Sequence, residues 1–212
     1  MRLRLPVLLL AAGLSLSPAL GQSGDSPAPL TPATLGQLVE CRGSADDLLS
    51  YAGTLFSDKP PSWLKPVHDN GHQGMIGLWT YQLDQSVDIF GHKIDRVSFM
   101  KNWVVVEMPR GEALSVVGQR HMERVPIHVT EQYYHFDDAG TGPMLGAFAP
   151  TDDVLDMAFG APPTPDSQNS TLFVGCNYSV VSKAEFLDGA RKADRMFGKA
   201  GGDIRHMPGD RP

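Results

Sequence analysis

Residues 75–108 read MIGLWTYQLDQSVDIFGHKIDRVSFMKNWVVVEM, and the predicted fold class depends mainly on these residues. It is rich in β-branched and aromatic residues, and three short breaks divide it into four runs. The breaks are Asp84-Gln85, Gly91-His92 and Lys101-Asn102, and the glycine of the second suits a type II′ hairpin. The spacing therefore predicts a four-stranded antiparallel meander over about 75–108. Its last run, WVVVEM, is nearly continuously apolar, which predicts a central strand covered on both faces.

Helical patterns precede this meander. Thr31-Pro32 is a capping residue followed by proline at the first helical position, and it predicts a helix that ends near Arg42-Gly43. Ser44 caps a second helix, with Asp47 as an acidic residue in its first turn. Two consecutive prolines, Pro60 and Pro61, end the pattern that follows.

Helical and strand patterns alternate irregularly after the meander. Apolar spacing predicts a helix over 111–122, and a β-rich composition predicts strands over 127–135 and 171–181. A capping residue, Thr151, predicts a short helix over 152–159. The capping box Ser182-Lys183-Ala184-Glu185 opens the last helix.

The order of these elements favours one fold class. Strict strand–helix–strand alternation is missing, and so is a G-x-G-x-x-G turn, which disfavours a dinucleotide-binding fold. The sequence predicts an α+β fold in which helices pack on one face of an antiparallel sheet built on the meander. We expect a single globular domain over 31–198, a disordered lead-in over 22–30 and a disordered tail over 199–212.

The first residues have the pattern of a secretory signal peptide. Arg2 and Arg4 precede a run of leucine, valine and alanine, and Ala19-Leu20-Gly21 fits a small-residue cleavage site. The apolar run is short for a membrane span. We therefore expect a cleaved leader over 1–21 and a periplasmic or secreted protein. An uncleaved N-terminal anchor is the alternative.

The chain contains only two cysteines, Cys41 and Cys176. In an oxidising compartment such a pair predicts one disulfide, whereas two buried free thiols are the alternative. The bridge would tie an N-terminal helix to a C-terminal strand. No C-x-x-C motif is present, so disulfide exchange is not indicated.

The charge balance limits the classes of partner. The chain has 18 Lys and Arg residues against 24 Asp and Glu, and loss of Arg2 and Arg4 with the leader would lower the net charge from −6 to −8. Nucleic acid and anionic membranes bind clustered cations, so we expect neither as a partner after leader cleavage. A cationic protein partner is compatible with this charge, although acidity also serves solubility alone.

The stretch HDNGH at 68–72 is the strongest local candidate for a site. His68, Asp69 and His72 offer nitrogen and oxygen ligands within five residues, and Asn70-Gly71 can fold the loop so that they converge. A divalent transition metal accepts such ligands. The alternative is an Asn-Gly turn that carries polar surface residues, because no fourth ligand is evident.

Three histidines, His121, His128 and His135, recur every seven residues. Pro126 interrupts any helix between the first two, so they do not form a ladder on one helix. If 127–135 is a strand, His128 and His135 face opposite sides because their spacing is odd.

Adjacent tyrosines, Tyr133 and Tyr134, lie in the strand predicted over 127–135. Aromatic residues in strands usually pack in the core. If this strand is covered on one face only, one of the two rings points outward and could contact a ligand or partner.

No catalytic constellation is evident, since neither a G-x-S-x-G nor an S-x-x-K motif is present in a suitable setting. The preferred interpretation is a non-catalytic secreted or periplasmic domain that binds a protein or small ligand and needs no cofactor. The alternative is a periplasmic metal-binding protein or hydrolase centred on His68, Asp69 and His72. The two differ in one observable: the second requires these three side chains to converge in a concave pocket.

Overall fold

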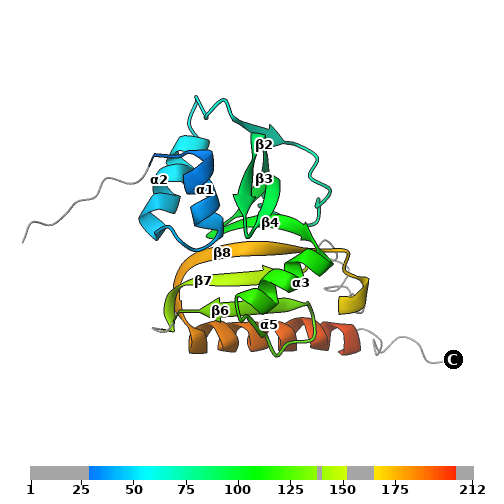
Figure 1. Cartoon of the computed structure of the whole chain (residues 1–212). Helices are drawn as coiled ribbons and strands as arrows, with labels where there is room; N and C mark the ends of the chain where they lie inside the picture. Colours follow the sequence, from blue (N-terminus) through cyan, green and yellow to red (C-terminus); the bar gives the residue numbers. More distant parts are fainter. Residues whose placement is uncertain (1–28, 138–139, 152–164, 204–212) are drawn as a thin grey trace, which may run out of the picture.

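The computed structural model describes residues 29–137, 140–151 and 165–203. Within these residues, eight antiparallel strands form one sheet in the order β1-β2-β3-β4-β8-β7-β6-β5, and four α-helices pack on it (Figure 1). The strands are β1 (Leu64–Val67), β2 (Trp79–Ile89), β3 (His92–Met100), β4 (Trp103–Pro109), β5 (Glu123–Arg124), β6 (Gln132–Phe136), β7 (Thr141–Phe148) and β8 (Thr171–Ser182). The helices are α1 (Pro32–Val39), α2 (Ala45–Leu55), α3 (Arg110–Gln119) and α5 (Lys183–Asp203), with one 3₁₀ turn, η1 (Asp166–Gln168). The predicted α+β class is confirmed.

Several sequence predictions lie outside the described residues. They are the leader over 1–21, nearly all of the lead-in over 22–30 and the short helix over 152–159. Helix α5 continues to Asp203, past residue 199, where the sequence predicts the start of the tail. Among the described residues, no helix is long and apolar enough to span a membrane.

The four-stranded meander is present, but its strands differ from those predicted. The first is β1, which precedes residue 75, and Asp84-Gln85 is not a turn. Strand β2 continues through that pair, and a register shift between Gln82 and Val87 absorbs the extra residues as a bulge. A polar pair in the sequence is therefore compatible with a bulge inside a strand and with a turn between strands.

The hairpin between β2 and β3 turns one residue earlier than predicted. Ile89 pairs with His92, so the loop residues are Phe90 and Gly91, with φ of 54° and 80°. Positive φ at both positions is the requirement of a type I′ turn, not the type II′ turn that the sequence suggested. The next turn, at Lys101-Asn102, lies where it was predicted.

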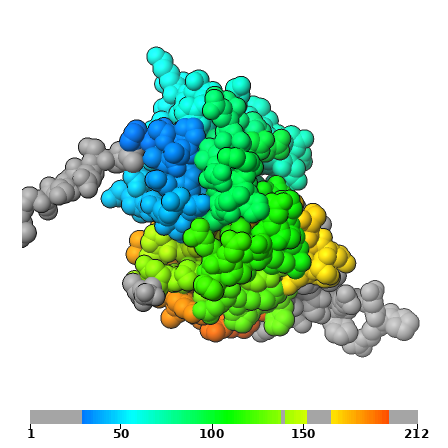
Figure 2. Space-filling view, in the orientation of Figure 1, coloured from blue at the N-terminus to red at the C-terminus, as the bar shows by residue number. Residues whose placement is uncertain are grey.

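Helices cover both faces of the sheet. The core cluster on one face contains residues of α1, α2 and α3 packed on β4 and β8, and Figure 2 shows blue α1 beside the cyan-to-green hairpin on this side. On the other face, Phe186, Leu187 and Ala190 of α5 pack against Tyr134 and Phe136 of β6. The sequence predicted helices on one face only, because periodicity shows that a helix has an apolar side but not which sheet face receives it.

A disulfide joins Cys41, just after α1, to Cys176 in the middle of β8. The Cα atoms lie 5.1 Å apart, and the two residues are 135 positions apart in the chain. The predicted pairing is confirmed. In the chain-entropy model, closing a loop of this length stabilises the fold by up to about 4–5 kcal/mol.

Candidate functional site

Strands β3 and β4 pair over only part of their length. The last cross-strand pair between them is Ser98 with Val105, although β3 continues back to His92 and β4 continues on to Pro109. Strand β4 stays paired with β8 over its whole length, whereas β3 stays with β2. The two halves of the sheet therefore diverge, and Figure 1 shows the β2–β3 hairpin rising away from β4 and β8.

A cavity of about 560 Å³ occupies the opening between the diverging strands. This volume lies within the range of about 300–1,000 Å³ that is typical of ligand pockets. We call it the β3–β4 cleft. Its lining comes from β2, β3, β4, α3, β8 and the loop before β2: Asn70, His72, Thr80, His92, Lys93, Ile94, Asp95, Arg96, Ser98, Glu107, Met108, Pro109, Glu112, Thr171 and Phe173.

One end of the cleft is built around the carboxylate of Glu107. The Nε2 atom of His72 lies 3.1 Å from its Oε1 atom, and the hydroxyl of Thr171 donates to the same oxygen at 2.7 Å. The His72 side chain is only 12% exposed, and its ring packs edge-on against buried Phe173 at 5.1 Å. These contacts fix the imidazole in the wall of the cleft.

The local sequence explains how His72 reaches this position. The side-chain oxygen of Asn70 accepts a hydrogen bond from the His72 amide at 2.9 Å, and Gly71 between them has a φ of 79°. Asparagine followed by glycine suits such a turn, because asparagine bonds the backbone two residues on and glycine adopts positive φ without strain. The turn brings the chain back toward β4.

A second polar row runs across β2 and β3. The amide of Asn70 donates to the hydroxyl of Thr80 at 3.2 Å, and the hydroxyls of Thr80 and Ser98 lie 2.8 Å apart. Thr80 and Ser98 are cross-strand partners, and both are buried. Buried hydroxyls need such partners, and this row supplies them inside the cleft.

A second histidine–carboxylate pair also lines the cleft. The Nδ1 atom of His92, at the start of β3, lies 3.0 Å from Oε2 of Glu112 on α3. The cleft therefore has one such pair from the loop before β2 and another from α3.

The two cations of the cleft are also engaged. Lys93 forms an ion pair with Asp88 of β2 at 2.9 Å. The guanidinium of Arg96 donates to the side-chain oxygen of Gln82 at 3.0 Å.

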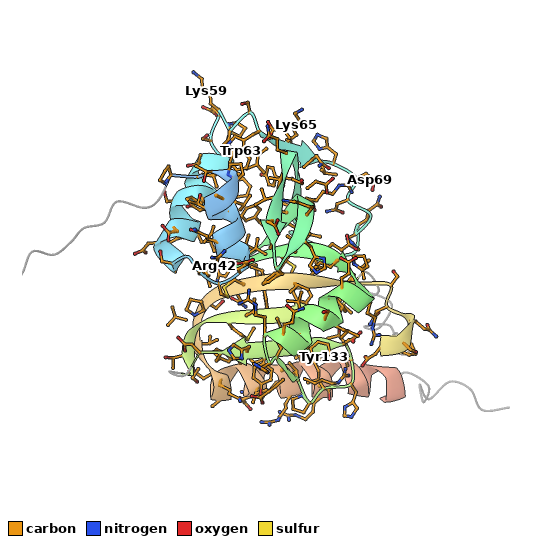
Figure 3. The ribbon with its side chains drawn as sticks, viewed as in Figure 1. Arg42, Lys59, Trp63, Lys65, Asp69 and Tyr133 are labelled. Carbon is orange, nitrogen blue, oxygen red and sulfur yellow. A yellow bond between two sulfur atoms is a disulfide. The ribbon has the colours of Figure 1, made fainter. Side chains whose placement is uncertain are left out.

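The predicted metal site is not formed by its three residues. Only His72 enters the cleft, whereas His68 and Asp69 are exposed, and Figure 3 shows Asp69 on the outer side of the loop. The Asp69 carboxylate accepts the Gly71 amide at 3.2 Å. Across the described part of the chain, no group of three or more His, Cys, Asp or Glu side chains is placed to hold a metal ion. The turn that carries His72 inward leaves the other two outside.

The groups around Glu107 can be compared with a nucleophilic catalytic relay. In a hydroxyl–imidazole–carboxylate relay, the imidazole lies between the other two groups so that it can take the hydroxyl proton. Here the carboxylate of Glu107 lies between the Thr171 hydroxyl and the His72 ring. The order of the three groups therefore differs from that of the relay.

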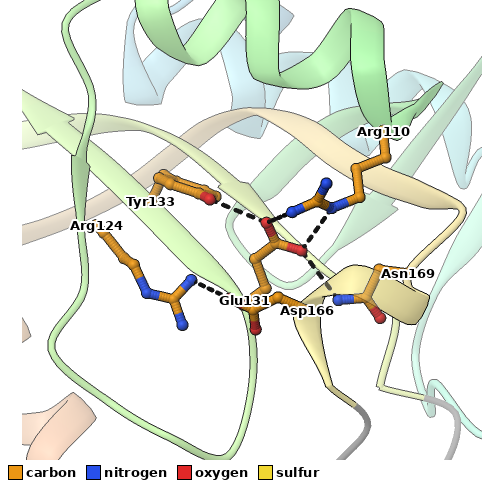
Figure 4. Close-up of polar contacts among 6 residues, drawn as sticks. All are labelled: Arg110, Arg124, Glu131, Tyr133, Asp166 and Asn169. Atoms are coloured by element: carbon orange, nitrogen blue, oxygen red, sulfur yellow. Dashed lines mark hydrogen bonds and ion pairs between the residues drawn. The ribbon is translucent and has the colours of Figure 1, made fainter.

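A buried carboxylate that sequence reasoning missed lies elsewhere, at Glu131 (Figure 4). Its side chain is 0% exposed, and Arg110 donates to both of its oxygens at 2.9 and 3.2 Å. Asn169 and the hydroxyl of Tyr133 donate at 3.0 and 2.9 Å. Burial alone would raise the pKa of Glu131, but these hydrogen bonds outweigh it and hold the pKa below its usual value.

The Glu131 cluster links segments that are distant in the chain. It joins the first residue of α3, the start of β6 and the segment before β8, and Arg124 beside it pairs with Asp166 of η1. The cavity next to Glu131 has a volume of only about 10 Å³, which is room for about one water molecule. No single residue type or spacing in the sequence identifies it, because its members are brought together from distant segments.

The two tyrosines lie on opposite faces of β6. Tyr134 is buried under α5, and its hydroxyl donates to Glu123 at 2.8 Å. Tyr133 is half-buried against the core of the other face and is held by Glu131. Since both faces of β6 are covered, the buried ring of Tyr134 is not a contact surface. A contact role for Tyr133 stays a prediction.

The three regularly spaced histidines have separate surroundings. His121 follows the end of α3 with a φ of 51°, and His135 is exposed on β6. The predicted strand over 127–135 is shorter than expected, since β6 begins at Gln132, and His128 lies in the loop before it. There His128 contacts the Asp194 carboxylate of α5 through its backbone amide and its ring.

The chain was compared with protein-family models, curated proteins and solved structures, and it matches none of them.

Proposed function

We propose that the mature chain is an exported, non-catalytic binding protein whose polar ligand occupies the β3–β4 cleft. The observation that carries this proposal is the cleft itself, a cavity of about 560 Å³ whose lining is rich in hydroxyl, amide, imidazole and carboxylate groups. A pocket of this size in which several polar groups converge is the usual form of a ligand site.

Two further observations support export. The first residues have the pattern of a signal peptide, and the Cys41–Cys176 disulfide is of a kind that forms and persists in oxidising compartments such as the periplasm. Together they favour the periplasm or full secretion over the cytosol.

A second candidate is docking of a protein partner at exposed aromatic residues. Phe56 and Trp79 are 59% and 57% exposed, and their rings meet edge-to-face at 5.9 Å. Large exposed aromatic side chains side by side are characteristic of protein contacts. Neither residue is among those that line the cleft.

Amide chemical-shift mapping tests the proposal and separates the candidates. The isotope-labelled mature protein would be mixed with millimolar amino acids, short peptides, hexoses and polyamines. We expect the largest shifts at cleft residues. Shifts confined to Phe56 and Trp79 would support the second candidate, and no shift with any compound would contradict the first.

A pair of variants on one loop sharpens this test. His72→Ala removes a cleft side chain and should weaken binding about tenfold, since one lost hydrogen bond costs about 1–1.5 kcal/mol. His68→Ala changes an exposed histidine on the same loop and should leave affinity unchanged. Equal affinities of the two variants for the ligand would exclude the cleft as the binding site.

A further inference from the structure

The cleft is bordered by two strand edges that lack neighbours. Beyond the Ser98–Val105 pair, the β4-facing edge of β3 over 92–97 and the β3-facing edge of β4 over 106–109 have no cross-strand partner within the described residues. Residues of both segments line the cavity. An unpaired strand edge presents amide and carbonyl groups that another extended chain can bond.

The cleft also receives side chains from both faces of the sheet. Glu112 belongs to α3, which packs on the same face of the sheet as α1, α2 and Cys176. Its carboxylate pairs with the ring of His92. His72 belongs to the loop on the opposite face, where it contacts Phe173 and Glu107. An extended peptide between the strands would direct successive side chains to alternate faces, so both pairs would meet side chains of the same ligand.

The charges of the cleft favour a basic ligand. Three carboxylates line it, from Asp95, Glu107 and Glu112, against the two cations Lys93 and Arg96. Lys93 also forms an ion pair with Asp88, an exposed carboxylate beside the lining residues. A lysine or arginine of a ligand could pair with Glu107 or Glu112, in keeping with the net charge of −6 on the whole chain.

We infer that the β3–β4 cleft binds an extended basic peptide segment, which adds a strand between β3 and β4 and presents a lysine or arginine to Glu107 or Glu112. This inference rests on the proposed function and specifies the ligand class of the same site. The partner is then a cationic protein or peptide with an accessible extended segment.

The test uses three pools of blocked pentapeptides added to the labelled mature protein. The first pool has a fixed central lysine and randomised flanks, the second has a central glutamate, and the third has the central lysine with N-methylated backbone amides. We expect the first pool to shift amides of 92–97 and 106–108. The other two should bind about tenfold more weakly, because one loses the charge pair and the other loses backbone hydrogen bonds.

Protein variants check that the charge acts in the cleft. Glu107→Gln keeps the shape of the side chain and should weaken binding of the lysine-centred pool about tenfold. Asp84→Asn removes an exposed carboxylate of β2 outside the cleft and should have no effect. Thermal unfolding of both variants verifies that each is folded.

The outcomes distinguish failure of the peptide inference from failure of the proposed binding function. Equal binding of the three pools, or no shift at 92–97 with any pool, overturns the peptide inference. If amino acids, hexoses or polyamines still shift the cleft residues, the proposed binding function stands without it. If nothing shifts them, both fail.

Discussion

His72 and Glu107 come from a loop and a strand 35 positions apart, yet Nε2 of one lies 3.1 Å from Oε1 of the other in the wall of the β3–β4 cleft. The pair links the loop before β2 to the centre of the sheet. Its geometry makes the cleft a defined site, and it provides the first prediction.

His72→Ala should lower the free energy of unfolding by about 1–2 kcal/mol, because it removes a largely buried hydrogen bond and the ring contact with Phe173. The exposed His68→Ala variant should change it by less than about 0.5 kcal/mol. Urea unfolding of both variants measures the difference. Equal stabilities would show that the loop does not hold His72 as described.

Glu131→Ala should cost about 3–5 kcal/mol, because it leaves Arg110 without its partner and empties a fully buried position. Glu112→Ala is the matched control, since that carboxylate is half exposed and pairs with His92 on the protein surface. Chemical denaturation measures both. A cost for Glu131→Ala below about 1 kcal/mol would contradict a structural role for the cluster.

Stability should fall in acid partly through Glu131. Its folded-state pKa lies below the usual value of 4.5, so its contribution is complete above that value and is lost as the pH falls through the lowered folded pKa. Glu131→Gln should therefore lose less stability than the wild type between about pH 5 and pH 3. Parallel losses in urea titrations of the two proteins would contradict this assignment.

Reduction of the Cys41–Cys176 bridge should destabilise the protein by about 2–5 kcal/mol, because the unfolded chain regains the freedom of a long loop. Thermal unfolding with and without reductant gives the difference. The Cys41→Ala, Cys176→Ala double variant should match the reduced protein and should not respond to reductant. An unchanged midpoint on reduction of the wild type would mean that the bridge does not stabilise the fold.

The mature N-terminus tests export independently of the cleft. We expect a mature chain that begins near Gln22, because Ala19-Leu20-Gly21 fits a cleavage site. Intact-mass measurement of protein from the periplasm or culture medium gives the residue directly. A chain that retains Met1 and stays in the membrane fraction would instead support an N-terminal anchor.

The features predicted correctly from the sequence are those that short local patterns or residue counts encode. Thr31 and Ser44 cap their helices as expected, each with a capping box, and the run 103–108 lies in the central strand β4. The disulfide followed from there being only two cysteines. Each of these predictions depends on neighbours within a few residues or on a residue count.

The parts that were missed depend on contacts distant in sequence. The cleft exists because residues 92–97 of β3, before Ser98, do not pair with β4, and no residue near that point signals the separation. The partners of Glu131 are Arg110, Tyr133 and Asn169, and two of them lie 21 and 38 positions away. Asp84-Gln85 shows the converse error, since a local turn signal was overridden by pairing of β2 with its neighbours.

The most direct test of the binding account is a residue-resolved map of amide chemical shifts in the mature protein on addition of the lysine-centred peptide pool. The account predicts that the largest shifts fall at 70–72, 92–98 and 106–108, and that Glu107→Gln reduces them. Shifts centred on Phe56 and Trp79, or their absence everywhere, would contradict it.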